Sequence, residues 1–103
     1  MMMSVDADVL KVLADPLRLR IVTLLAGESL CVCHLIEETG AKQTNLSNHL
    51  KVLREAGLVD TEPCGRFVYY RLRPEGIGVV AAALGELADT ARDTVANARK
   101  RPC

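Results

Sequence analysis

The spacing of apolar residues changes at Gly57 from a helical pattern to a strand pattern, and that change constrains the fold more than any other feature. Residues 43–56 carry apolar side chains at helical spacing. These are Leu46, Leu50 and Leu53. After Gly57, which is placed to end a helix, residues 58–62 and 67–72 have the composition of strands, and residues 63–66 supply a turn between them. The sequence therefore predicts a helix followed directly by a β-hairpin.

Three shorter helices are predicted before this pair and one long helix after it. Their ranges are 5–14, 16–26, 30–39 and 75–100. Asp15 and Pro16 suit a cap and a first helical position, and Pro74 opens the last helix. The predicted fold is mainly α with a small β-hairpin, in the order α-α-α-α-β-β-α. This is a single winged helix-turn-helix domain over residues 1–103.

The composition favours a dimer. Half of the 103 residues are apolar, but only one Phe and two Tyr are present, so the core depends on aliphatic side chains. In a chain of this size, surplus apolar surface is often buried in an oligomer. The Ala-rich stripe of residues 75–100 is near heptad spacing, which favours close approach of another helix. A dimer in which residues 75–100 pack on a partner is therefore expected.

The charge distribution indicates where nucleic acid would bind. The formal net charge is zero, but residues 42–73 hold six basic and three acidic side chains, whereas residues 1–41 hold three basic and six acidic ones. In a helix-turn-helix the second helix enters the major groove, and here that helix is 43–56. The positions expected to contact DNA from this helix and its entry are Lys42, Gln43, Thr44, Asn45, Ser47, Asn48, His49, Lys51 and Arg54.

Amide and hydroxyl side chains at the start of that helix can donate to and accept from base edges. His49 is expected to be structural or to contact phosphate. Arg66 at the hairpin tip is placed for a minor groove or a phosphate. Arg71 and Arg73 are assigned to the second strand, and Arg71 is also expected to contact DNA. The predicted partner is therefore double-stranded DNA, although a winged-helix module that binds only protein has the same pattern of elements.

Other classes of protein are disfavoured by the sequence. It has no phosphate-cradling glycine loop and no His-Glu zinc motif, so an enzyme is not expected. No apolar run is long enough for a membrane helix, and Met1, Met2 and Met3 are followed by acidic residues, unlike a signal peptide. A cytoplasmic protein is expected, in which the four cysteines stay reduced and serve metal binding or redox chemistry.

Three segments of the chain resemble the ArsR/SmtB family of metalloregulatory repressors. Residues 14–21 (ADPLRLRI) are similar to its opening signature, residues 43–59 (QTNLSNHLKVLREAGLV) to its recognition helix, and residues 65–72 (GRFVYYRL) to its wing. The resemblance covers roughly residues 8–75. It implies a homodimer whose first and last helices form the interface. It also implies that the apo dimer represses an operon and that an inducer releases the DNA.

Residues 30–35 (LCVCHL) resemble the metal-binding box of the arsenite- and cadmium-sensing branches of that family. Thiolates select soft ions, and the resemblance implies arsenite or antimonite bound by Cys31 and Cys33. Three departures leave the ion open. Ile36 stands where the arsenite branch often has a third cysteine, the N-terminus lacks the cysteines of the cadmium and lead branch, and His34 replaces the usual Asp. A cadmium, lead or zinc sensor remains an alternative. His34 is either a nitrogen ligand for zinc or cadmium or a surface histidine beside the site, and the second reading is favoured.

The third ligand also stays open, with Cys64 in the hairpin turn and Cys103 at the C-terminus as candidates. The last predicted helix has no histidine, which disfavours the family's zinc and nickel site. In an undistorted helix, positions i and i+2 are roughly 200° apart, so Cys31 and Cys33 could not both reach one ion. Either this stretch is already frayed, or the ion pulls it out of helical geometry. The hypothesis that follows is that inducer binding distorts this helix, shifts helix 43–56 and weakens DNA binding. A thiol redox switch of Cys31 and Cys33 is the remaining alternative.

Overall fold

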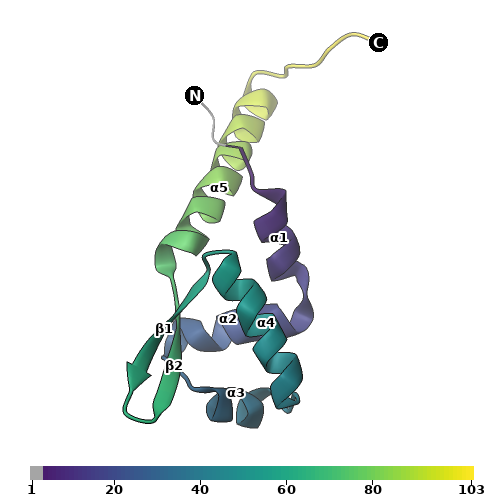
Figure 1. The fold of residues 1–103 in the computed structure, drawn as a ribbon. Coiled ribbons are helices and arrows are strands. Elements are labelled where there is room, and N and C mark those ends of the chain that lie inside the picture. The colour runs from purple at the N-terminus through teal and green to yellow at the C-terminus, as the bar shows by residue number, and fades with distance from the viewer. Residues whose placement is uncertain (1–3) are drawn as a thin grey trace.

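The computed structural model describes residues 4–103, and Figure 1 shows the order of their elements. They are α1 (Ala7–Ala14), α2 (Pro16–Gly27), α3 (Val32–Thr39), α4 (Gln43–Glu55), β1 (Val59–Cys64), β2 (Phe67–Leu72) and α5 (Pro74–Ala96). The predicted winged helix-turn-helix order is confirmed. Met1, Met2 and Met3, the start that was predicted not to be a signal peptide, lie outside the described residues.

Two aspartates set the starts of the first two helices. The Asp6 carboxylate accepts hydrogen bonds from the backbone N–H groups of Asp8 and Val9, so α1 begins after Asp6 rather than at residue 5 as predicted. The Asp15 carboxylate accepts from the backbone N–H groups of Leu17 (2.9 Å) and Arg18 (3.1 Å). These bonds stabilise the ionised carboxylate, and the bond from Arg18 is the main cause of the lowered pKa of Asp15.

The core lies between α2, α3, α4 and the start of the hairpin. Its fully buried side chains are Ile21, Leu35, Leu46, Leu50, Leu53 and Leu58. The three leucines predicted to face inward from residues 43–56 are all among them. Because α4 is held through these leucines, its opposite face is free of packing and available to a partner.

The junction between α4 and the hairpin depends on Gly57, whose φ of 77° is a conformation that side-chain-bearing residues rarely adopt. The Leu58 N–H donates to the Leu53 carbonyl (3.0 Å), and the Gly57 N–H donates to that of Arg54 (3.0 Å). The Arg73 N–H then donates to the Leu58 carbonyl (2.8 Å), which closes the base of the hairpin. The hairpin is therefore anchored to the end of α4 by buried Leu58.

The hairpin turn is shorter than predicted. β1 and β2 pair antiparallel as far as Cys64 opposite Phe67, and Pro63 lies opposite Val68. The predicted turn of residues 63–66 was wrong, because Gly65 (φ 62°) and Arg66 alone make a two-residue turn that matches the strand twist. Pro63 is tolerated because this sheet has two strands, so each has an edge that needs no N–H donor.

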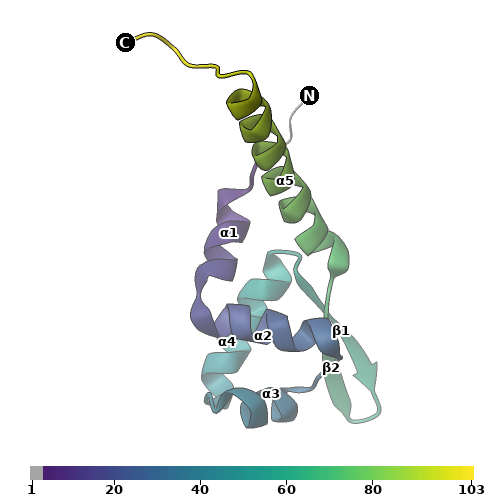
Figure 2. The ribbon, with the colours of Figure 1, turned by 180° about the vertical axis from the view of Figure 1, so that it is seen from behind.

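Helix α5 leaves the body at the end opposite α3 and the hairpin tip, and α1 lies on the same side as α5 (Figures 1 and 2). The molecule measures 62 × 23 × 21 Å. α5 ends at Ala96 rather than at residue 100, since Ala98 has a φ of 50° and leaves the helical conformation. Large apolar side chains on α5 remain exposed, namely Val79, Leu84, Leu87 and Val95. Within residues 4–103, no helix combines the length and apolar character needed to cross a bilayer.

Candidate functional site

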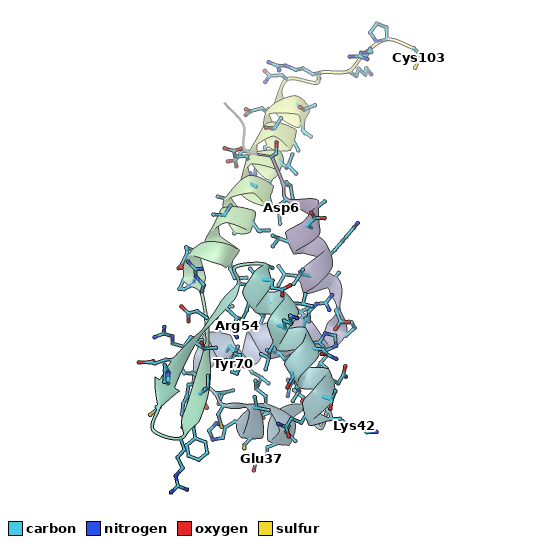
Figure 3. All side chains as sticks on the ribbon, viewed as in Figure 1. Asp6, Glu37, Lys42, Arg54, Tyr70 and Cys103 are labelled. Atoms are coloured by element: carbon cyan, nitrogen blue, oxygen red, sulfur yellow. The ribbon has the colours of Figure 1, made fainter. Side chains whose placement is uncertain are left out.

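The outer face of α4 presents the side chains that the sequence predicted for base contact. They are Gln43, Thr44, Asn45, Ser47 and Asn48, and all are exposed. Lys42 precedes the helix without a side-chain capping bond, so the first N–H groups of α4 and the Lys42 ammonium face solvent at one end of the molecule (Figure 3). This combination of free N–H groups, amides and positive charge suits a phosphate backbone and the adjoining base edges.

His49 lies at the side of α4 and contacts the corner between α1 and α2. Its Nδ1 is 3.0 Å from Nη1 of Arg18, and the Arg18 Nε donates to the Val12 carbonyl (2.7 Å). A guanidinium N–H can donate only to an unprotonated ring nitrogen, so this contact requires the tautomer with its proton on Nε2. Arg18 thus connects α1, α2 and α4, which fits the structural role among the two predicted for His49.

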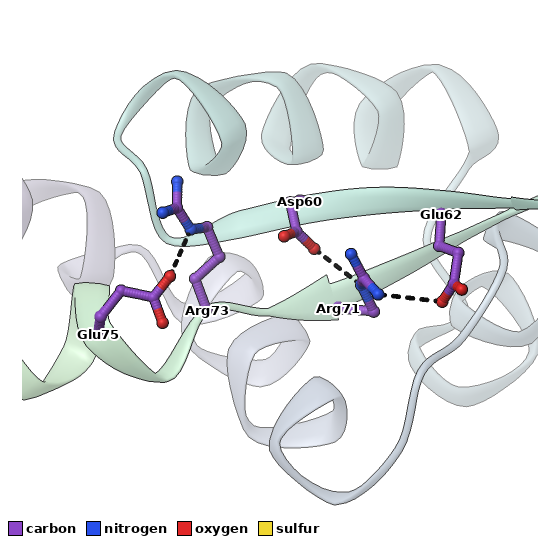
Figure 4. Close-up of polar contacts among 5 residues, drawn as sticks. All are labelled: Asp60, Glu62, Arg71, Arg73 and Glu75. Carbon is purple, nitrogen blue, oxygen red and sulfur yellow. Dashed lines mark hydrogen bonds and ion pairs between the residues drawn. The ribbon is translucent and has the colours of Figure 1, made fainter.

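The β1–β2 hairpin is the wing of this fold, and the arginines on it and just after it differ in their surroundings. Figure 4 shows Arg71 and Arg73. Arg71 donates to Asp60 (2.9 Å) and Glu62 (3.1 Å) on the paired strand, and the hydrogen bond with Asp60 is the main cause of its raised pKa. Arg73 donates to Glu75 (2.8 Å). Arg66 is exposed in the turn and takes part in none of these pairs. Of the two wing arginines predicted to contact DNA, Arg66 and Arg71, only Arg66 has its charge free of these carboxylates.

Helix α3 begins two residues later than predicted, and this changes the geometry of the cysteine pair. Leu30 forms an isolated β-bridge with Tyr70, which holds residue 30 in extended backbone. Cys31 is the N-cap, with φ −90° and ψ 171°, and Val32 is the first helical residue. Since Cys31 lies outside the helix, the predicted separation of roughly 200° between the two sulfurs does not apply. Cys31 is buried and Cys33 is exposed.

His34 closes the first turn of α3 onto Cys31. Its Nδ1 accepts the Cys31 backbone N–H (3.2 Å) and lies 3.3 Å from the Cys31 Sγ. Its ring also lies beside that of Tyr69 on β2, with centroids 6.1 Å apart and tilted by 52°. His34 therefore contacts both the thiol and the wing.

A pocket of 340 Å³ opens between the start of α3 and the wing. It is lined by Cys31, Cys33 and His34 on one side and by Phe67 and Tyr69 on the other. Neither aromatic residue was predicted from the sequence to belong to the site. Their alternation on the second predicted strand placed them on one face, but nothing in the sequence showed that this face meets the cysteine pair.

Neither of the predicted third ligands is among the residues that line this pocket. Cys64 lies at the end of β1 and is exposed, and Cys103 lies at the far end of the molecule (Figure 3). Across residues 4–103, no three His, Cys, Asp or Glu side chains are grouped closely enough to hold a metal ion. The pair Cys31 and Cys33, with His34 adjacent, is the arrangement that the pocket offers to a ligand.

Comparison with known proteins places this geometry in context. Residues 15–61 match the family model described as bacterial regulatory protein, arsR family. The chain is 47% identical over 68 residues to the arsenic resistance transcriptional regulator ArsR1 of Pseudomonas putida, covering 65% of this chain and 53% of that protein. It is 41% identical over 66 residues to the transcriptional repressor SmtB homolog of Synechocystis, covering 64% and 50%. The chain therefore spans about half the length of these two relatives.

A solved structure gives a match over nearly its whole length. It is described as a possible transcriptional regulator for arsenical resistance, with a TM-score of 0.71 and 39% sequence identity, over 90% of this chain and 98% of that one. The winged arrangement of α3, α4 and the hairpin is thus shared with a protein of similar size.

Proposed function

Because the chain belongs to the ArsR family, whose members are DNA-binding transcription factors and not enzymes, we propose that it is a transcriptional repressor released from DNA by a thiol-binding metalloid. The repressing form is the apo homodimer on double-stranded operator DNA. Arsenite or antimonite, bound by Cys31 and Cys33, is the inducer. The pocket that the cysteine pair shares with the wing is the observation that carries this proposal.

DNA binding rests on the outer face of α4 and on the hairpin tip. α4 lies in the major groove through its exposed amides and hydroxyls, while Lys42, Lys51, Arg54 and Arg66 contact phosphates. The buried leucines of α4 fix the orientation of this face relative to the hairpin. Two such units in a dimer read two half-sites about one helical turn, or a multiple of it, apart.

The dimer forms through α1 and α5 in this proposal. α5 exposes Val79 (62%), Leu84 (43%), Leu87 (49%) and Val95 (81%), which a second copy of the chain would cover. A shallow apolar pocket lined by Ala88, Ala91 and Val95 continues the same helix. Small residues at these positions allow two helices to approach closely.

Soft thiolates select the inducer, because arsenic, antimony and cadmium prefer sulfur to oxygen. The relative ArsR1 is named for arsenic resistance, which favours arsenite here. Relatives named for SmtB also match, so a cadmium, lead or zinc inducer is the second candidate, with His34 as a nitrogen ligand. Oxidation of the cysteine pair is the third.

Release follows from what the ligand would displace. The Cys31 thiol and backbone contact His34, and the preceding residue, Leu30, is hydrogen-bonded to Tyr70 of β2. A change at Cys31 therefore acts on both the first turn of α3 and β2. α3 packs against α4, which carries the DNA-reading face. A coupling of roughly 1–3 kcal/mol between ligand and DNA is typical of such two-site systems.

A DNA-mobility assay on the chain's own upstream region tests the inducer. Arsenite, antimonite, cadmium, zinc and peroxide are added in turn to the reduced protein. The proposal expects release with arsenite and antimonite, and retention with zinc and with peroxide. Release by cadmium or zinc alone would instead support the second candidate, a cadmium, lead or zinc inducer. Release by peroxide alone would support a redox switch of the cysteine pair.

A further inference from the structure

We propose that the pocket between α3 and the wing prefers a trivalent arsenical with one organic substituent, RAs(OH)₂, over inorganic arsenite. This inference rests on the proposed function of Cys31 and Cys33 as the inducer site. It assigns the wing side of the pocket, formed by Phe67 and Tyr69, to the organic group R.

The number of thiols in the pocket fits such a ligand. Trivalent arsenic forms three covalent bonds, and in RAs(OH)₂ one of them is a stable bond to carbon. The thiols of Cys31 and Cys33 form two As–S bonds while two As–O bonds break, and the two hydroxyls leave as water with the two thiol protons. The oxidation state does not change, and no third protein ligand is needed.

Inorganic arsenite bound by the same two thiols is left with one As–O bond. After the same two exchanges, As(OH)₃ keeps one hydroxyl, which has to be solvated or replaced by a third thiol. Neither of the other two cysteines lines this pocket. Cys64 is exposed and is the strand partner of Phe67, but among residues 4–103 it forms no metal-binding group with Cys31 and Cys33. Cys103 is beyond the end of α5 (Figure 3).

The wing side of the pocket offers an apolar surface at the position of R. Phe67 is 55% exposed, although it is the largest apolar side chain of the wing. Tyr69 lies next to it in the pocket lining and holds the His34 ring at 6.1 Å. A volume of 340 Å³ is within the range of roughly 300–1,000 Å³ found for small-molecule sites. A ligand that covers Phe67 removes apolar area from water, and aromatic rings favour tilted or offset contacts with one another.

The test compares two probes, phenylarsine oxide and sodium arsenite, on the reduced full chain. Binding is followed by native mass spectrometry and by competition with a small dithiol. A peptide of sequence LCVCHL is the reference, because it has both thiols and lacks the wing. The matched variants are Phe67→Ala and Val68→Ala, since Val68 is also exposed on the wing but does not line the pocket.

The preference for the phenyl compound over arsenite should be about tenfold greater in the protein than in the peptide. Phe67→Ala should remove most of that excess, whereas Val68→Ala should keep it. An equal preference in the protein, the peptide and Phe67→Ala would overturn the inference but leave the proposed function intact. Failure of both probes to bind at Cys31 and Cys33 would overturn the proposed function as well.

Discussion

Leu30, which precedes buried Cys31, is hydrogen-bonded to Tyr70 of the wing in both directions. The Leu30 N–H donates to the Tyr70 carbonyl (3.1 Å), and the Tyr70 N–H donates to the Leu30 carbonyl (2.7 Å). Leu30 is also buried in the core. A displacement of Cys31 therefore cannot leave β2 unaffected, because the adjacent peptide is part of the hairpin's hydrogen-bond pattern. Cys31 is the link between the pocket and this bridge.

The bridge predicts a change in amide exchange when the inducer binds. In the apo protein the amides of Leu30 and Tyr70 should be protected, and arsenite should increase their exchange rates. Hydrogen exchange followed by NMR measures both, with the Leu46 amide inside α4 as the internal control. Unchanged protection of Leu30 and Tyr70 in the arsenite-bound protein would mean that the signal does not pass through the wing.

Lys51 is proposed to contact phosphate, and it is exposed on α4. Lys51→Ala should weaken binding to all DNA sequences and lower the slope of log K against log salt by about 1. Fluorescence anisotropy over a salt series measures this slope. Lys100→Ala, at the other end of the molecule, is the matched control and should keep the wild-type slope. Equal slopes for the two variants would remove Lys51 from the interface.

The wing arginines should contribute unequally to DNA binding. The positive charge of Arg71 faces Asp60 and Glu62, and its raised pKa shows that these carboxylates stabilise the charged form. Arg66→Ala should therefore lower the salt slope by about 1, and Arg71→Ala should lower it by less. The same salt series compares them. A larger loss for Arg71→Ala would indicate that DNA displaces the two carboxylates.

Two glycines of α5 allow a test of the fold itself. A Cβ at Gly76 would lie 2.7 Å from the Gly57 carbonyl oxygen, whereas one at Gly78 would have no heavy atom within 4 Å. Gly78→Ala should stabilise the protein by about 0.5–1 kcal/mol, because alanine is favoured in helices. Gly76→Ala should destabilise it, since backbone has to move. Thermal unfolding compares the two variants, and equal Tm values would show that α5 does not approach Gly57 this closely.

The fold could be predicted because its signals are local. The spacing of Leu46, Leu50 and Leu53 and the glycine after the helix define α4 without knowledge of distant residues. The errors arose where distant segments meet. Leu30 continues the apolar pattern of a helix, but its pairing with Tyr70 keeps it extended, so α3 starts at Val32.

The candidate site was only half visible in the sequence for the same reason. The two cysteines are adjacent in sequence, and their chemistry is evident from residue type alone. Phe67 and Tyr69 join them only because the hairpin folds back against α3, a contact across more than thirty residues. The pairing of Arg71 with Asp60 likewise depends on the strand register, which a shorter turn than predicted has set.

The most direct test of the account is the affinity for operator DNA, measured with and without arsenite, in the wild-type chain and in the Cys31→Ser, Cys33→Ser double variant. Cys64→Ser is the control with one thiol removed outside the pocket. We predict that arsenite weakens wild-type and Cys64→Ser binding by about 5–150-fold, and that the double variant binds DNA equally with and without arsenite. Release of the double variant by arsenite would contradict the claim that the cysteine pair is the sensor.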